Sequence, residues 1–200
     1  MGKKFYAVKC GQKPGIYTDW DTCKEMVHGY PNAIYKSFPT DEEAEAYMGN
    51  LNSSVNEADA EYENYAFVDG SYNIQTNVYG YGGFLVESGH KHIIQGSGSD
   101  PDMAAMRNVA GEVKGSMEAI ELAVRLGLDE IVIYYDYIGI EMWATGEWKR
   151  NKSGTIMYYD YIQSVKDKIK IRFVKVKGHS GIEGNEEADR LAKDAVGISI

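Results

Sequence analysis

YAFVDGSYN, residues 65–73, is the stretch that decides the fold, because an apolar run leads there into an aspartate and a Gly-Ser pair. The run from Tyr65 to Val68 is typical of a buried strand, and the Gly-Ser pair predicts a turn directly after Asp69. A carboxylate at the inner end of a buried strand is unfavourable unless its charge is compensated. Asp69 is therefore a candidate functional residue, and its role depends on what the fold places beside it.

A second apolar strand ends in the same way. IVIYYD, residues 131–136, is a continuous apolar run that predicts a buried parallel strand ending at Asp136. If the two strands are neighbours, Asp69 and Asp136 lie side by side, and each negative charge favours protonation of the other. A divalent cation would remove that conflict. The alternative for either aspartate alone is an ordinary residue of a strand-end turn or helix cap.

The segments around these two strands predict a mixed sheet with helices packed on it. The first strand continues into two more, over 79–88 and 90–98, which form an antiparallel meander joined at Ser88-Gly89. The charge pattern of the strand over 170–176 predicts a bulge or strong twist near Phe173-Val174. Helices are expected over 104–126, about 138–145, 154–167 and 183–196.

The first fifty residues form a separate small unit in this prediction. Residues 51–63 are polar and acidic and resemble a flexible linker, so the expected boundaries are 1–50, 51–63 and 64–200. The first unit has the pattern β-β-α-β-α, and its first helix can begin at Thr18, Asp19 or Asp21.

Composition and charge restrict the functional class. The chain lacks an apolar run long enough to span a membrane and has only two cysteines, so we expect a reduced cytoplasmic protein. The net charge is −9, but the segment from Glu147 to Lys177 holds nine Lys and Arg residues against three acids. Such segregation allows a basic face for a phosphate backbone despite the acidic total. Nothing in the sequence indicates an obligatory protein partner.

Two further acids are candidates because of their surroundings. Glu112 lies on the long predicted helix among Gly111, Gly115 and Ser116, whose small side chains allow close approach to a sheet. Asp189 lies on the last predicted helix, in EEADRLA. Taken singly, each is equally compatible with a solvated helix acid.

Four segments follow one another along the chain: FVDGS, GEVKGSMEAI, IYYD and VKGHSGIEGNEEADRLA. Their order resembles the type 1 ribonuclease H family, from residue 64 to about 196. The resemblance implies a five-stranded mixed sheet, three strands antiparallel and two parallel, flanked by helices. It implies an endoribonuclease that cuts the RNA strand of RNA/DNA hybrids and leaves 3′-hydroxyl and 5′-phosphate ends, using two Mg²⁺ ions, with Mn²⁺ as a substitute. The residues that match the family's catalytic positions are Asp69, Glu112, Asp136, Asp189 and His179.

The resemblance also implies a role for each of these side chains. Asp69 would bridge both metal ions, and Asp136 and Asp189 would each hold one side. Glu112 would hold the product-side ion and touch a ribose 2′-hydroxyl. His179, in the loop KGHSGIEG, would transfer a proton or help release product.

Nucleic-acid contacts follow from the same resemblance. Asn108 is a candidate reader of the 2′-hydroxyl, Asn185 would orient the site, and Arg107 is the expected phosphate ligand before Glu112. The family's long basic insertion is reduced here to GEWKRNKSG, residues 146–154. Within that segment the candidate phosphate contacts are Trp148, Lys149 and Arg150, with Lys152.

Residues 4–48 resemble the hybrid-binding domain, related to the caulimovirus viroplasmin module, that precedes type 1 ribonucleases H. This similarity implies DNA-strand contacts by aromatic residues and a phosphate contact by lysine, although Tyr6 and Trp20 would also suit the core of so small a domain. Two alternatives to a hybrid-cleaving enzyme are a non-cleaving binding module and a metal phosphoesterase on the same fold with another substrate. The residues that match the contact positions of the hybrid-binding domain are Tyr6, Trp20, Tyr35 and Lys36.

Overall fold

The computed structural model describes residues 4–30, 33–48, 62–178 and 181–198, and the chain forms two compact units, Met1–Ser53 and Ser54–Ile200. The linker predicted over 51–63 lies almost entirely outside the described residues. Among the helices that are described, none is both long and apolar enough to cross a membrane.

The N-terminal unit confirms the predicted order β-β-α-β-α, with an antiparallel sheet in the order β2-β1-β3. Of the three candidate caps, Asp19 begins the first helix, because its side chain accepts a hydrogen bond from the Thr22 amide at 2.8 Å. The elements are β1 (Phe5–Cys10), β2 (Gly15–Tyr17), α1 (Trp20–Val27), β3 (Ile34–Phe38) and α2 (Asp41–Met48).

The C-terminal unit is a five-stranded mixed sheet in the order β6-β5-β4-β7-β8. The first three strands in sequence form the predicted antiparallel meander, and β7 pairs in parallel with β4 and β8, as expected. Ser88 and Gly89 turn the chain between β5 and β6, both with positive φ, which suits a tight hairpin. The strands are β4 (Asn64–Asn73), β5 (Val78–Glu87), β6 (His90–Gly98), β7 (Glu130–Tyr135) and β8 (Lys170–Lys175).

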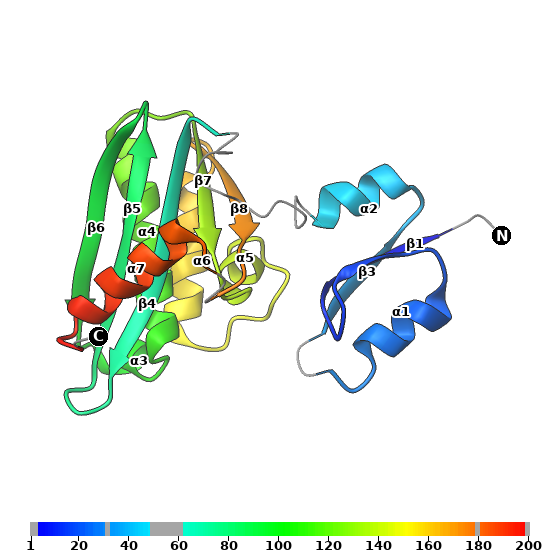
Figure 1. Ribbon diagram of the computed structural model, residues 1–200, viewed down its shortest axis with the longest axis horizontal. Helices are drawn as coiled ribbons and strands as arrows, with labels where there is room; N and C mark the ends of the chain where they lie inside the picture. The colour runs from blue at the N-terminus through cyan, green and yellow to red at the C-terminus, as the bar shows by residue number, and fades with distance from the viewer. Residues whose placement is uncertain (1–3, 31–32, 49–61, 179–180, 199–200) are drawn as a thin grey trace. The chain divides into compact units, whose positions relative to one another are not determined.

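Helices cover both faces of this sheet (Figure 1). The last helix, drawn in red, crosses one face over β4 and β5, whereas the longest helix lies on the other face with the remaining helices beside it. The helices are α3 (Pro101–Ala104), α4 (Asn108–Arg125), α5 (Gly139–Ala144), α6 (Ser153–Val165) and α7 (Glu183–Asp194).

The core between the sheet and α7 is largely aromatic. Phe67 of β4 stacks on Tyr134 of β7, with ring centroids 4.6 Å apart, and Phe84 of β5 packs beside them. Ala188 of α7 completes this cluster, and its small side chain lets the helix lie close to the rings. The packing of α7 on the sheet therefore rests on this aromatic cluster.

Close backbone approach fixes α4 against the opposite face of the sheet. A Cβ on Gly111 would collide with the Gly80 carbonyl oxygen, and a Cβ on Gly70 would collide with the carbonyl oxygen of Asn108. Only glycine permits such contact between a helix and a strand. The position of Glu112, between these contacts, is consequently set by main-chain packing.

Three local predictions are wrong. The turn expected after Asp69 is absent, because β4 continues through Gly70 to Asn73 and pairs with β5 along its whole length. The helix expected over 104–126 is divided into α3 and α4 at Arg107, whose φ is +55°. Of the bulge or strong twist expected near Phe173-Val174, the bulge does not occur, since β7 and β8 pair in continuous register from Lys170 to Lys175.

Candidate active site

Three of the predicted acids come together on the C-terminal unit. Asp69, Glu112 and Asp136 each offer a carboxylate oxygen, and these oxygens all lie within 4.8 Å of one another. Asp69 is on β4, Glu112 is in the first half of α4, and Asp136 directly follows β7. Three elements far apart in sequence thus contribute one acidic cluster.

The strand register explains why the two aspartates meet. Phe67 of β4 pairs with Tyr134 of β7, and each aspartate lies two residues beyond its member of that pair. A step of two residues returns the side chain to the same face of a strand. Asp69 and Asp136 therefore project side by side where β7 ends and β4 continues.

Glu112 reaches the cluster from the opposite face of the sheet. Gly70 has no side chain in its path, and a Cβ there would lie 2.9 Å from Cγ of Glu112. The glutamate is 3% exposed, and its Oε2 is a buried oxygen without a hydrogen-bond partner. A buried carboxylate oxygen of this kind requires a proton or a cation.

The electrostatics of the cluster favour protonation when no cation is present. Burial, followed by the charges of Asp136 and Asp189, raises the pKa of Asp69 to about 7, although a hydrogen bond from the Gly70 amide opposes the shift. Burial and then the charges of Asp136 and Asp69 raise the pKa of Glu112 well above its usual range. These carboxyl groups are held together against their mutual repulsion.

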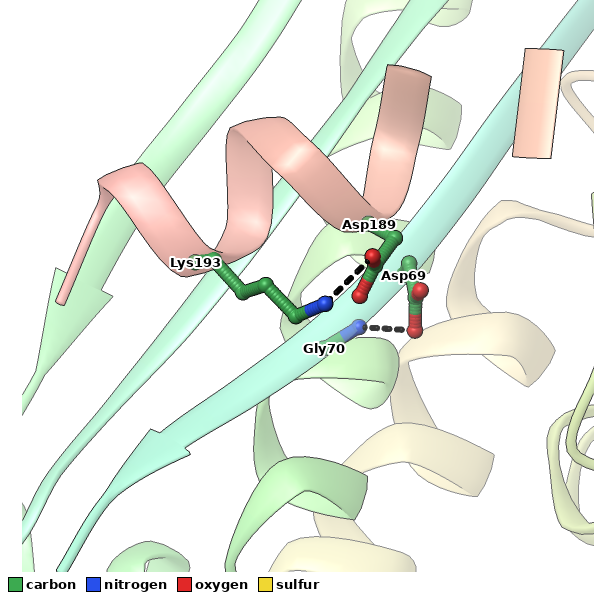
Figure 2. Close-up of polar contacts among 4 residues, drawn as sticks. All are labelled: Asp69, Gly70, Asp189 and Lys193. Atoms are coloured by element: carbon green, nitrogen blue, oxygen red, sulfur yellow. Dashed lines mark hydrogen bonds and ion pairs between the residues drawn. The ribbon is translucent and has the colours of Figure 1, made fainter. Parts of the chain in front are cut away.

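Asp189 lies beside Asp69, on α7, but is not part of the three-acid cluster (Figure 2). Its Oδ2 accepts from the Lys193 ammonium, one helical turn later, at 2.6 Å. The side chains of Lys193 and Asp189 are 32% and 17% exposed. The fourth predicted acid is thus near the site and bound to a cation of its own helix.

The predicted asparagines are placed differently from each other. Asn108, exposed at the start of α4, donates from Nδ2 to Oε1 of Glu112 at 3.4 Å. Asn185 is 3% exposed, and its Oδ1 is buried without a hydrogen-bond partner. Arg107 is exposed at the N-cap of α4. The contact of Asn108 with Glu112 links this residue directly to the acidic cluster.

His179 lies outside the described residues. The glycine before it, Gly178, passes so close to the cluster that a Cβ there would lie 2.6 Å from Oδ2 of Asp136. The chain that follows β8 therefore runs over the Asp136 carboxylate up to the last described residue before His179.

An aromatic cavity adjoins the acidic cluster. Tyr137, next to Asp136, packs against Trp143 and Trp148 with ring centroids 5.7 and 6.4 Å away, and burial and then the charge of Glu112 raise its pKa. The cavity measures about 290 Å³. Its lining includes Met106, Val109, Tyr137, Trp143, Lys149, Asn151, Lys152 and Thr155.

The predicted basic segment, residues 146–154, lies at this cavity. Lys149 is exposed and lines it, whereas Trp148 is half-buried against the other rings. Arg150 donates from Nη1 to the Trp148 carbonyl at 2.9 Å and stacks on the ring of Tyr159 at 4.0 Å. Arg150 therefore stabilises the backbone at Trp148 through this hydrogen bond.

The N-terminal unit presents a row of aromatic rings. Trp20 lies between Tyr6 and Tyr35, with ring centroids 5.5 and 5.7 Å away, and Trp20 and Tyr35 are 41% and 45% exposed. Lys36 points to the other face of the sheet, since neighbouring strand residues alternate, and its ammonium lies 5.5 Å from the Tyr47 ring centroid. The structure thus groups three of the four predicted residues and separates Lys36 from them.

Sequence reasoning missed Lys193, Tyr137 and Trp143. The spacing of Asp189 and Lys193, four residues apart on a helix, was a visible signal of an ion pair. No local signal marked Tyr137 and Trp143, because their meeting depends on Gly139, where a Cβ would crowd both rings.

Carboxylates gathered from two parallel strands and a helix, on a mixed sheet of three antiparallel and two parallel strands, define an α/β protein of the ribonuclease H-like class. The chain belongs to the RNase H family, whose family description matches residues 62–197. A second family, described as the ribonuclease H1 N-terminal domain, matches residues 4–48.

Individual proteins agree with this assignment. Human ribonuclease H1 is 27% identical over 253 residues, covering 95% of this chain and 88% of the human protein. A ribonuclease H of Saccharomyces cerevisiae is 46% identical over 52 residues, which are 26% of this chain and 15% of the yeast protein. The crystal structure of RNase H1 from Halobacterium salinarum NRC-1 has a TM-score of 0.53 and 23% identity, covers 68% of this chain and 98% of that one, and supports the fold.

Proposed function

We propose that this chain hydrolyses the RNA strand of RNA/DNA hybrids, using a divalent-cation site built on Asp69, Glu112 and Asp136, with Asp189 beside it. The observation that carries the proposal is the convergence of three carboxylates within 4.8 Å, one of them with a buried oxygen that lacks a partner. Family membership supports the substrate class, since relatives over most of the chain are named ribonuclease H1.

The donor set suits Mg²⁺, with Mn²⁺ as a substitute. Both ions prefer carboxylate and water oxygens, and Mg²⁺ is commonly held by a few carboxylates together with substrate phosphate. Asp69, Glu112 and Asp136, with Asp189 beside them, are the residues that would hold the ions of a two-metal site. When bound, the ions would neutralise charge on the scissile phosphate and lower the pKa of the attacking water.

The chain's own residues position this chemistry. Asn108 orients Glu112 through its amide and lies where it can also meet a ribose 2′-hydroxyl at the surface. Asn185, buried in α7 one turn before Asp189, would orient the site from within the fold. His179, which follows Gly178 beside Asp136, would carry the proton to the leaving oxygen.

Hydrolysis in this proposal adds water across the bond between phosphorus and the 3′-oxygen. The nucleophile is water, and the leaving 3′-oxygen takes a proton. The products are therefore a 3′-hydroxyl end and a 5′-phosphate end. A chain that used a ribose 2′-hydroxyl as nucleophile would instead leave a cyclic phosphate, so end-group analysis tests this step.

Two surfaces would hold the duplex. On the C-terminal unit, Arg107 and the segment with Trp148, Lys149 and Arg150 offer cations and rings close to the acids. On the N-terminal unit, the exposed rings of Trp20 and Tyr35, in a row with half-buried Tyr6, suit stacking on bases or sugars. Lys36, on the other face of that sheet, would reach a phosphate only at the edge of the row.

The test is a cleavage assay on RNA/DNA, RNA/RNA and DNA/DNA duplexes of one sequence, each with Mg²⁺ and with excess chelator. We expect cleavage of the RNA strand of the hybrid alone, lost on chelation and restored by Mg²⁺ or Mn²⁺. Equal cutting of RNA/RNA, or cutting that survives the chelator, would refute the proposal. Binding of hybrid without any cutting would favour the non-cleaving module instead.

A further inference from the structure

Lys193 forms an ion pair with Asp189, the acid that α7 contributes beside the cluster. Its Nζ lies 2.6 Å from Oδ2 of Asp189, which itself lies beside Asp69. Figure 2 shows the ammonium reaching along α7 toward the two aspartates. It therefore supplies a positive charge where the acids need one.

The pair is short but not locked in place. Lys193 is 32% exposed and Asp189 17%, so water reaches both groups, and the flexible lysine stem can swing the ammonium away. Within the described part of the chain, no backbone group accepts a hydrogen bond from the ammonium. The arrangement is thus that of an exchangeable counter-ion rather than a buried structural pair.

We propose that Lys193 competes with a divalent cation for Asp189, so that the cation on the Asp189 side binds only when the ammonium moves away. The inference rests on the proposed function, because it assumes a metal site on these acids. Lys193 is then a positioning residue that sets how much free metal the site requires. It keeps Asp189 turned toward Asp69 in the metal-free protein and weakens the site at low metal concentration.

The physical reason is that one carboxylate oxygen cannot give its full charge to two cations. Removing the ammonium frees Oδ2 and increases the negative potential at Asp69 and Asp189 together. Solvent screening reduces this gain because both side chains are partly exposed. We expect divalent affinity on the Asp189 side to rise by about tenfold, which corresponds to about 1.4 kcal/mol.

The experiment is calorimetric titration of the full chain with MnCl₂, without nucleic acid, at fixed pH and ionic strength. Lys193→Met keeps the length and removes the charge, and Lys193→Arg keeps the charge. Lys114→Met is the matched control. Lys114, on α4, forms an ion pair with Glu118 at 3.6 Å, and this pair has the same i,i+4 spacing as Asp189 and Lys193 on α7. Lys193→Gln replaces the methionine variant if that one does not fold, as judged by circular dichroism.

We expect about tenfold tighter Mn²⁺ binding for Lys193→Met at its weaker site, and affinities within about threefold of the parent for Lys193→Arg and Lys114→Met. Adding Asp189→Asn to Lys193→Met should remove the gain, because the two residues act on one interaction. Equal or weaker binding by Lys193→Met, in a parent that binds Mn²⁺, overturns the inference and leaves the proposed function intact. Failure of the parent itself to bind Mn²⁺ overturns both.

Discussion

Replacing Asp69 with asparagine should stabilise the metal-free protein, and increasingly so as the pH rises. Asp69 has a pKa of about 7 in the folded chain against an ordinary value of 3.8, because of burial and then the charges of Asp136 and Asp189. The folded state therefore holds a proton that the unfolded chain has already released between about pH 4 and pH 7. Asparagine keeps an oxygen for the Gly70 amide and carries no charge.

The magnitude follows from linkage. A pKa raised above its unfolded value in an acid means that stability falls as the pH rises through this window and stays reduced above it. With one tenfold change in proton affinity worth 1.36 kcal/mol, the penalty is about 2 kcal/mol at pH 5 and about 4 kcal/mol at pH 8. Asp69→Asn removes that penalty, so its advantage over the parent should grow by about 2 kcal/mol between these pH values.

Urea unfolding in excess EDTA at pH 5 and pH 8, monitored by aromatic circular dichroism, measures this difference. Asp160→Asn, which removes the same charge from an exposed position on helix α6, corrects for the change in net charge. Mg²⁺ should reduce the advantage of Asp69→Asn at pH 8, because bound cation stabilises the parent by mass action. A variant less stable than the parent at pH 8, or an advantage independent of pH, would refute the reasoning.

Three further predictions concern separate parts of the molecule. Asp136→Asn should abolish hybrid cleavage while changing hybrid affinity less than about threefold, because it removes a cation ligand and no binding surface; parent-like turnover in a gel assay would count against the metal role. Trp20→Ala should weaken hybrid binding by about 10- to 100-fold in fluorescence anisotropy, from the loss of one stacking ring, and unchanged affinity would show that the row of rings is structural. Gly111→Ala should lower the free energy of unfolding by about 3 kcal/mol, since its Cβ collides with the Gly80 carbonyl oxygen; Gly115→Ala, whose Cβ would lie 3.4 Å from Tyr81 Cβ, is the control and should be near neutral.

The sequence was sufficient for the sheet and for the two clustered aspartates, because both depend on strong local patterns. The apolar runs before Asp69 and Asp136 are long enough to predict buried strands, and neighbouring parallel strands bring their following residues together. Glu112 required the family resemblance, since a glutamate on a helix carries no signal of its own. The small residues around it were a correct indication of close packing.

The errors arise where tertiary pairing overrides local chemistry. Gly70-Ser71 has the composition of a turn, but β5 offers ten residues of antiparallel partner and holds the strand extended. Arg107 lies between α3 and α4 with a positive φ, and no glycine or proline at this position marks the break between the helices in the sequence. In β8 the change in charge parity occurs at Lys175, the last residue of the strand, and so marks its end rather than a bulge.

The ion pair of Asp189 and Lys193 illustrates a different limit. Helical spacing alone allows the two side chains to meet, as it does for Lys114 and Glu118, so the spacing does not distinguish this pair. Only the packing of α7 over β4 brings this pair beside Asp69. Its importance could not be judged without the fold.

The three clustered acids come from β4, α4 and β7, with α7 contributing the fourth beside them. No short fragment of the chain can therefore hold the whole arrangement. During synthesis from the ribosome, Asp69, Glu112 and Asp136 emerge well before Asp189, so an incomplete polypeptide lacks its last acid and the lysine that accompanies it. The order of residues along the chain thus delays completion of the site until α7 has been made.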